Sequence, residues 1–267
     1  MKKISRITTQ KRSKHRYNIF IDDGHEEKYG FSVDEDVLIK HNLRKGLELN
    51  ETMIEKLLQD DTFQKSYGEV IKYLSYRMRT KKEIIDYLEK KEANEKYITK
   101  ILEKLTAEKL IDDQAFANSF VRSRIKTTTK GPGLVKQELQ IKGVSSTIAD
   151  QAIVQYNYET QYEKAKKIAE KRLSKKSRNS INKQQQQLQA TLIRNGFFQD
   201  VIQDVLTEAQ QEYHDDEIEA VYYQGEKLLR KHHGRLSGYE LKNKLKEALY
   251  RQGFKIESIN EYLNEIN

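Results

Sequence analysis

A short pattern that recurs at intervals of roughly fifty residues constrains the fold of this 267-residue chain more than any other feature. In each copy a leucine precedes a glycine by four positions, and an apolar residue follows the glycine. The three clearest copies are Leu139 to Val144, Leu192 to Phe197 and Leu249 to Phe254. Glycine favours the left-handed backbone conformation in which many helices end, and the leucine then lies one turn back on the buried face.

A period near fifty residues holds about three helices of three or four turns each. A fourth copy begins at Leu88 but carries Glu92 in place of the glycine, and we expect the turn to be kept because Asn94 can cap the next helix. Helix starts are also marked: Thr80 to Glu83 and Ser237 to Glu240 both have the spacing of a capping box.

The first part of the chain has a different pattern. Tyr17, Ile19 and Ile21 alternate with other residues and are followed by Asp23-Gly24, which indicates a strand and a hairpin turn. We expect a second strand over 27–33 and a short helix over about 34–42. The predicted fold is therefore mainly α, with tandem three-helix repeats in an elongated array preceded by a small N-terminal β-containing domain. The predicted boundaries are 1–68 for the N-terminal domain and 69–111, 112–158, 159–213 and 214–267 for the four repeats.

Composition agrees with many small helical cores, because only 36% of the residues are hydrophobic, 34% are charged and there is a single proline. The run from Gln184 to Gln187 is expected to be solvent-facing helix. The positions expected to form the structural core of the repeats are Leu88, Leu139, Gly143, Leu192, Gly196, Phe197, Leu249, Gly253 and Phe254.

Residue patterns typical of enzymes are missing from the sequence. It has no cysteine, which excludes disulfides and zinc–thiolate sites, and no phosphate-binding or dinucleotide-binding glycine motif. His214 to Glu217 suggests an acidic helix start more than a metal site, and Gly131-Pro132-Gly133 suggests a turn more than a phosphate site on free helix amides. We therefore expect no metal, no cofactor and no enzymatic activity.

Charge is distributed unevenly along the chain. Residues 1–20 carry seven Lys/Arg and no acid, and residues 120–183 carry fifteen Lys/Arg against five Asp/Glu, although the net charge of the whole is only +8. A basic middle between acidic flanks indicates a polyanion or an acidic protein groove as partner; the alternative is a set of solvated helix faces. The candidate contact residues are Arg77, Arg79, Lys81, Lys82, Arg122, Arg124, Lys126, Lys130, Lys136 and Lys142.

Five tyrosines gather in the first repeat, at positions 67, 73, 76, 87 and 97. Near basic side chains such residues can stack on nucleic-acid bases. The alternative, which we favour for each of them, is a ring packed at the edge of a small core with a solvated hydroxyl.

An ordered series of motifs resembles the RecX regulatory protein family, in its long Gram-positive form. The matching residues are Tyr73 to Glu83, Leu88, Leu110 to Asp113, Phe116-Ala117, Phe120 to Arg122, Arg124, Lys130 to Gly133, Glu138-Leu139 and Lys142-Gly143. The last two repeats match only through the leucine-to-glycine pattern, and Glu92 departs from the glycine that is common there.

The resemblance implies a RecA-binding regulator built from tandem three-helix repeats. It implies docking along the groove of a RecA–single-stranded DNA filament and restraint of the ATPase, strand-exchange and co-protease activities of RecA. We accordingly expect a cytoplasmic, monomeric protein whose partners are RecA and DNA, single-stranded or duplex, with no membrane association. Two alternatives stay open, namely a tandem helical protein that binds duplex DNA directly and a scaffold for another acidic partner.

Overall fold

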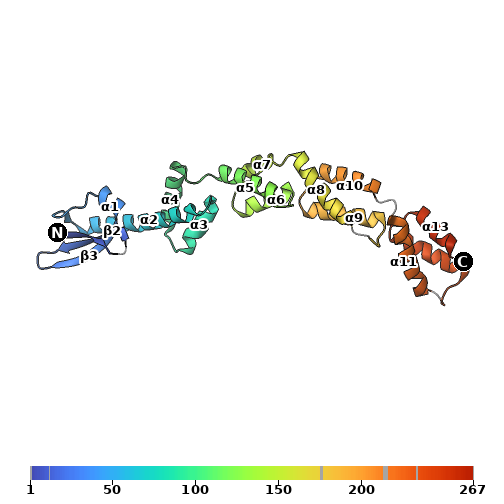
Figure 1. Ribbon diagram of the computed structural model, residues 1–267. Helices are drawn as coiled ribbons and strands as arrows, with labels where there is room; N and C mark the ends of the chain where they lie inside the picture. Colours follow the sequence, from blue (N-terminus) through green and yellow to red (C-terminus); the bar gives the residue numbers. More distant parts are fainter. Residues whose placement is uncertain (1, 12, 175–176, 213–215, 233, 267) are drawn as a thin grey trace. The chain divides into compact units, whose positions relative to one another are not determined.

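The computed structural model describes every residue except 1, 12, 175–176, 213–215, 233 and 267. Four strands are followed by a long series of helices, with one short helix inside the strand region (Figure 1). Chain contacts divide the molecule into two compact units, 1–116 and 117–267. The first unit holds the sheet, the first repeat and the start of the helix over 113–127, and the second unit holds the rest of that helix and the helices that follow it.

The N-terminal sheet is antiparallel and has the strand order β3-β2-β1-β4. Its strands are β1 (Lys2–Gln10), β2 (Ser13–Asp22), β3 (Glu27–Asp34) and β4 (Glu48–Leu49), and α1 (Glu35–Lys40) follows β3. Ile19 on β2 lies opposite both Ile7 and Phe31, so its side chain is at the centre of the sheet and fully buried. This sheet is the predicted β-containing domain.

Helix α2 (Glu51–Ser75) joins the sheet to the first repeat. Its Leu57 packs in the core of the sheet, whereas Tyr67 and Val70 pack in the core of the first repeat. The helix thus runs through the position where we placed the first domain boundary, at residues 68 and 69.

A buried ion pair fixes α2 to the sheet. Both carboxylate oxygens of Asp61 accept hydrogen bonds from the guanidinium of Arg16, at 3.1 and 3.0 Å, and Asp61 also accepts from the backbone N–H of Asp34 at 2.8 Å. Desolvation alone would raise the pKa of Asp61, but these hydrogen bonds, with Lys65, hold it below its ordinary value.

The remaining helices form the repeats. The first repeat combines the end of α2 with α3 and α4, and each later repeat takes the next three helices in order. Their bounds are α3 (Lys81–Lys90), α4 (Glu95–Ala107), α5 (Asp113–Thr127), α6 (Pro132–Ile141), α7 (Ser146–Ile153), α8 (Tyr158–Leu173), α9 (Ile181–Arg194), α10 (Gln199–Glu212), α11 (Asp216–His232), α12 (Gly238–Arg251) and α13 (Ile256–Glu265).

The recurring leucines and glycines end the second helix of every later repeat, as predicted. Gly143, Gly196 and Gly253 have φ values of +84°, +80° and +86°. In each case the N–H of the following residue donates to the carbonyl of the leucine, at 3.0, 3.2 and 3.3 Å, which is the six-residue closure of a Schellman motif. All three leucines are fully buried, which confirms the prediction from the pattern.

The first repeat makes the same turn without a glycine. Glu92 has φ +58°, the N–H of Ala93 donates to the carbonyl of Leu88 at 3.0 Å, and Asn94 caps α4 as expected. Thr80 and Glu83 form the predicted capping box at the start of α3.

Two local predictions are wrong. Ser237 precedes α12 but makes no side-chain capping bond, because Gly238 with φ +54° departs from the helical geometry that a capping box needs. Gln184 is buried rather than solvent-facing, and its amide donates to the carbonyl of Asn179 at 2.8 Å. A buried polar side chain at this position is sustained by that hydrogen bond.

Successive repeats of the second unit contact one another at the glycine turns. The N–H groups of Gly131 and Gly133, at the start of α6, donate to the carbonyls of Asn195 and Gly196, at the end of α9, at 2.7 and 2.9 Å. The start of one helix thereby satisfies the free carbonyls at the end of another. These two α6 amides are therefore occupied by protein, which agrees with the preference for a turn over a phosphate site.

The junction between the third and fourth repeats has the same arrangement, but its hydrogen-bond donors are side chains. The Ser180 hydroxyl and the Asn182 amide, at the start of α9, donate to the carbonyls of Gln252 and Gly253, at the end of α12, at 2.6 and 2.9 Å. The start of the second helix in one repeat is thus joined to the glycine turn of the next repeat in both cases.

Lys164 on α8 adds a second contact between the second and third repeats. Its ammonium donates to the carbonyls of Ile125 and Thr128, the latter at 2.7 Å, and so caps the end of α5. Burial lowers the pKa of Lys164, and the nearby charge of Lys167 adds to this effect.

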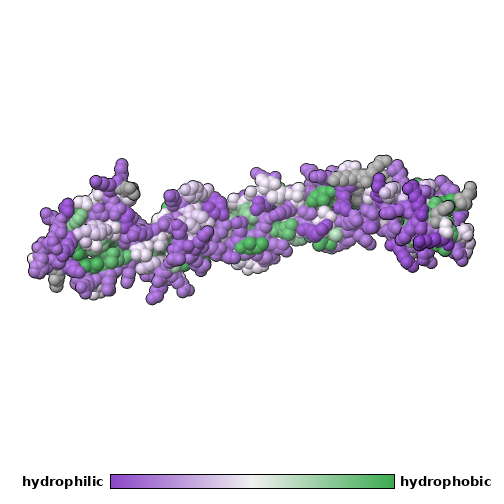
Figure 2. All heavy atoms as spheres, turned by 90° about the horizontal axis from the view of Figure 1, so that it is seen from below, coloured by the Kyte–Doolittle hydropathy of each residue, from purple (hydrophilic) through white to green (hydrophobic). Residues whose placement is uncertain are grey.

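Small, separate cores leave a largely hydrophilic surface. On the face shown in Figure 2, apolar side chains gather only in limited patches among hydrophilic ones. Among the described residues, every helix is too short or too polar to span a bilayer.

Candidate interaction surface

The ten candidate cations fall into two groups on different compact units of the chain. Four lie at the connection between α2 and α3, and six lie on α5, on α6 and in the turns that follow these helices. Their partners within the protein decide which of them can offer charge to another molecule.

In the first group the two arginines shape the connection between the helices. Arg77 makes a two-pronged ion pair with Glu83, at 2.9 and 3.1 Å, and also donates to the carbonyl of Met78. The hydrogen bond to Glu83 raises the pKa of Arg77. Arg79 lies over the ring of Tyr73 at 4.0 Å, a cation–π contact, and its Nε is buried without a hydrogen-bond partner in the described part of the chain.

The two lysines of this group point to solvent. Lys81 and Lys82 occupy the first turn of α3 and are exposed. Lys81 forms no ion pair with any described residue. Within this group, the two arginines are engaged by neighbouring side chains, whereas Lys81 has no described carboxylate as an ion-pair partner.

In the second group a single carboxylate holds two of the cations. Glu138 on α6 pairs with Arg124 at 2.7 Å and with Lys130. Desolvation would raise the pKa of Glu138, but the hydrogen bonds from Lys130 and Arg124 lower it. Arg124 also lies over the Phe120 ring on its own helix, at 4.5 Å from the ring centre. Its ion pair with Glu138 joins α5 to α6.

The other members of the second group differ in how far they are engaged. Lys136 pairs with Asp150 at 2.5 Å, and Arg122 donates to the side chain of Gln155 at 3.3 Å. Lys142 lies 5.9 Å from the centre of the Phe120 ring. Lys126 is exposed and forms no ion pair within the described residues.

Most of the clustered tyrosines are core residues. Tyr67 is buried, Tyr73 stacks on Tyr87 with ring centres 4.2 Å apart, and Tyr97 packs edge-on at 6.2 Å from Phe63. Tyr76 alone among the five has a mostly exposed ring, with 73% of its surface accessible. The packing alternative therefore describes four of the five.

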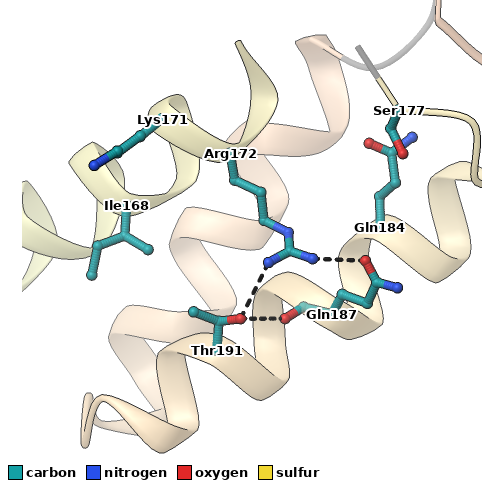
Figure 3. Close-up of a pocket in the computed structure, with 7 residues that line it drawn as sticks. All are labelled: Ile168, Lys171, Arg172, Ser177, Gln184, Gln187 and Thr191. Carbon is teal, nitrogen blue, oxygen red and sulfur yellow. Dashed lines mark hydrogen bonds between the residues drawn. The ribbon is translucent and has the colours of Figure 1, made fainter. Parts of the chain in front are cut away.

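Sequence reasoning missed the basic residues of the third repeat as a site. Lys171 and Arg172 on α8 line a pocket with α9 (Figure 3), and Lys164 caps a helix of the neighbouring repeat. The signal was present in the dense basic segment up to residue 183. It did not identify these positions because no motif marks which cations of such a run line a pocket or cap a helix.

Groups of side chains suited to a metal ion are not found among the described residues. Of the predicted acidic helix start, His214 and Asp215 lie outside the described residues. Glu217 is buried and accepts a hydrogen bond from the N–H of Lys255 at 3.1 Å, at the start of α13. This carboxylate stabilises the fourth repeat.

Family comparisons account for all five segments of the chain. Residues 2–50 match the regulatory protein RecX N-terminal domain, residues 67–105 the first RecX three-helix domain and residues 112–153 the second. The third three-helix domain matches twice, at 159–206 and at 215–263. The third and fourth repeats are therefore copies of one domain type.

Relatives and solved structures agree with this assignment. The regulatory protein RecX of Oceanobacillus iheyensis is 47% identical, over 99% of this chain and 98% of its own, and that of Halalkalibacterium halodurans is 41% identical over 98% and 99%. A crystal structure of regulatory protein RecX aligns with a TM-score of 0.70 at 39% identity, covering 77% of this chain and 98% of its own. A structure of RecX from Lactobacillus salivarius aligns with 0.54 at 35% identity, covering 57% and 99%.

The N-terminal sheet, the four repeats with their left-handed turns and the near full-length relatives lead to one assignment: this chain belongs to the RecX family of regulatory proteins.

Proposed function

We propose that this protein is a non-enzymatic regulator of RecA that binds the groove of the RecA–single-stranded DNA filament and restrains the ATPase, strand exchange and co-protease activities of RecA. The observation that carries the proposal is the match of every segment to a RecX domain, with relatives named regulatory protein RecX over nearly the full length. The identity of RecA as the partner rests on the family resemblance.

Tandem repeats suit a partner that is itself a repeating polymer. Several weak contacts in one chain gain affinity together when the partner presents its sites at fixed spacing, and they gain nothing on an isolated protomer. The two glycine-turn junctions support this mode of binding, because they fix the second, third and fourth repeats to one another within the second unit. Restraint follows if the protein binds one filament state more tightly than another.

Exposed cations are the most suitable groups for contact with phosphate or acidic protein. Lys81 and Lys126 are exposed and form no ion pair with a described residue, and Arg122 is exposed and bonded to a neutral amide. Arg124 and Lys130 share Glu138, so part of their charge is neutralised inside the protein. We therefore place the main filament contacts at the first set and assign the second set a positioning role.

Co-sedimentation with preformed RecA filaments on oligo(dT) tests the proposal. The full-length protein should pellet with filaments and bind free RecA poorly. The variant Lys81→Gln/Lys126→Gln should bind more weakly and with a smaller salt dependence, because removing one ionic interaction lowers the slope of log K against log salt by roughly one unit.

The matched control is the double variant Lys130→Gln/Lys136→Gln, which removes two cations that are already paired within the protein. Its salt slope should stay closer to that of the wild type. Equal affinity for free RecA and for filaments would overturn the filament-specific mode. Tight binding to random duplex without RecA would instead favour a direct DNA-binding protein.

A further inference from the structure

The third repeat contains a pocket of about 420 Å³ between α8 and α9. Figure 3 shows Arg172 reaching from α8 toward Gln187 and Thr191 on α9, while Ile168 forms part of the wall. The volume falls within the range of small-molecule sites, which is about 300–1,000 Å³. The lining residues are Ile168, Lys171, Arg172, Ser177, Gln184, Gln187 and Thr191.

Neutral side chains hold Arg172 in the pocket. Its Nη2 donates to the Gln187 side-chain oxygen at 2.7 Å, and its Nη1 donates to the Thr191 hydroxyl at 3.4 Å. A guanidinium has five N–H donors, so donors remain for a ligand, and both of these partners leave the positive charge uncompensated. The described lining residues include two cations and no carboxylate, and the pocket therefore favours an anion.

The other lining groups favour a nucleotide over a bare carboxylate. The planar guanidinium matches the oxygens of a phosphate. Lys171 points away from that guanidinium and adds positive charge at the edge of the pocket (Figure 3). Ile168 offers an apolar surface for a sugar or base, and the Gln187 amide nitrogen can donate to a base edge. A carboxylate side chain would use only the charged part of this volume.

The sequence around the pocket extends the attraction to a nucleic-acid backbone. Residues 164–183 carry nine Lys/Arg and one acid, Glu170, which does not line the pocket. Two of the nine are engaged within the protein, because Lys164 caps α5 and Lys166 pairs with Glu208. A basic groove with a site for an unpaired base is the usual arrangement for single-strand binding. In a duplex the bases are paired and stacked, so they cannot enter such a pocket without unstacking.

We propose that this pocket binds one nucleotide of a single-stranded nucleic acid, with its phosphate on Arg172 and its sugar and base against Ile168 and Gln187, while Lys171 adds positive charge at the edge of the site. The proposal deepens the filament-binding function by assigning a direct contact to the strand, and it rests on that function only for its biological setting. Free oligonucleotide suffices to test it.

Fluorescence anisotropy of labelled oligo(dT) with the full-length protein, without RecA, is the experiment. Lys171→Gln/Arg172→Gln should weaken binding by about tenfold at 0.1 M salt and lower the salt slope by roughly one unit, since each single-strand phosphate contact contributes about 0.7. The control Lys167→Gln/Lys183→Gln removes the same charge from exposed positions on α8 and α9 that do not line the pocket. It should change the affinity less than threefold.

A second variant keeps the proposal testable if loss of Arg172 disturbs packing. Gln187→Glu retains the hydrogen bond to Arg172 but neutralises its charge, so this protein should remain as stable as the wild type and still bind oligo(dT) several-fold more weakly. Duplex of the same length and hexaglutamate serve as competitors and should displace oligo(dT) poorly.

Three results would overturn the proposal that this pocket binds a nucleotide. They are equal weakening by the pocket and control variants, unchanged binding by both pocket variants, and displacement by hexaglutamate as effective as by unlabelled oligo(dT). Because RecA is absent from this assay, none of these results tests the proposed regulation of RecA, which is tested separately by co-sedimentation with filaments.

Discussion

Glu92 and Asp61 each hold an unusual state that the surrounding fold imposes. Glu92 adopts φ +58° at the turn where the other three repeats have glycine, and left-handed backbone costs a residue with a Cβ roughly 1–2 kcal/mol. Asp61 keeps its charge while almost completely buried, because Arg16 and a backbone N–H compensate it. Both predict measurable consequences of single substitutions.

The Glu92 turn predicts a stabilising substitution. Glu92→Gly should raise the free energy of unfolding of the first unit by about 1 kcal/mol, since glycine adopts this backbone conformation without steric penalty. Urea denaturation followed by circular dichroism would measure the change. Glu89→Gly, at an exposed position inside α3, should lower stability by about 1 kcal/mol. Two changes of the same sign would contradict the explanation.

The Asp61 pair predicts a pH-dependent stability. Because its pKa is lowered in the folded state, the ionised carboxylate contributes stability above its unfolded pKa, about 3.9, and this is lost as pH falls through the lower folded value. Asp61→Asn should cost about 3 kcal/mol at pH 7, since it leaves the half-buried Arg16 without its charge partner. The difference from the wild type should shrink below about pH 4.

Asp60→Asn provides the comparison, because Asp60 pairs with Lys40 and His41 at a more exposed position. Its cost should be about 1 kcal/mol or less. If the cost of Asp61→Asn stayed constant as the pH fell well below about 4, the charge of Asp61 would not be what stabilises the unit.

At the scale of helices, the leucine-to-glycine pattern predicted where the second helix of each repeat ends, because that signal lies within one turn of chain. The contacts between repeats were not predictable in this way. Gly131 meets the turn at Gly196 only after two repeats have folded, and nothing local distinguishes it from a loop glycine. Ion pairs such as Arg124 with Glu138 are likewise set by packing, which is why a count of charges overestimated the free cations.

The junction between the second and third repeats predicts a steric effect. A Cβ on Gly131 would lie 2.6 Å from backbone atoms of Gly196 and Phe197, although the backbone of Gly131 has an ordinary negative φ. Gly131→Ala should therefore destabilise the second unit by about 1–3 kcal/mol through overpacking. Gly68→Ala in α2 meets nothing within 4 Å and should instead gain about 0.5–1 kcal/mol. Thermal unfolding of both variants would measure these changes in stability. If Gly131→Ala left the stability unchanged, the junction would be open in solution.

At the scale of the whole molecule, the family assignment and the succession of repeats lead to the same functional claim. The chain has four related units, of which the last three are joined by hydrogen-bonded junctions. Several linked units are suited to contact a repeating polymer at more than one site. Such a protein should restrain RecA only when RecA is assembled in its filament.

The most direct test is the single-stranded-DNA-dependent ATPase of RecA, titrated with the full-length protein on preformed filaments. Inhibition should be complete at fewer than one copy per RecA protomer, because a chain that binds as proposed would bridge neighbouring protomers. An unchanged ATPase rate at saturating protein, or inhibition that requires one copy per protomer together with equal affinity for free RecA, would contradict it.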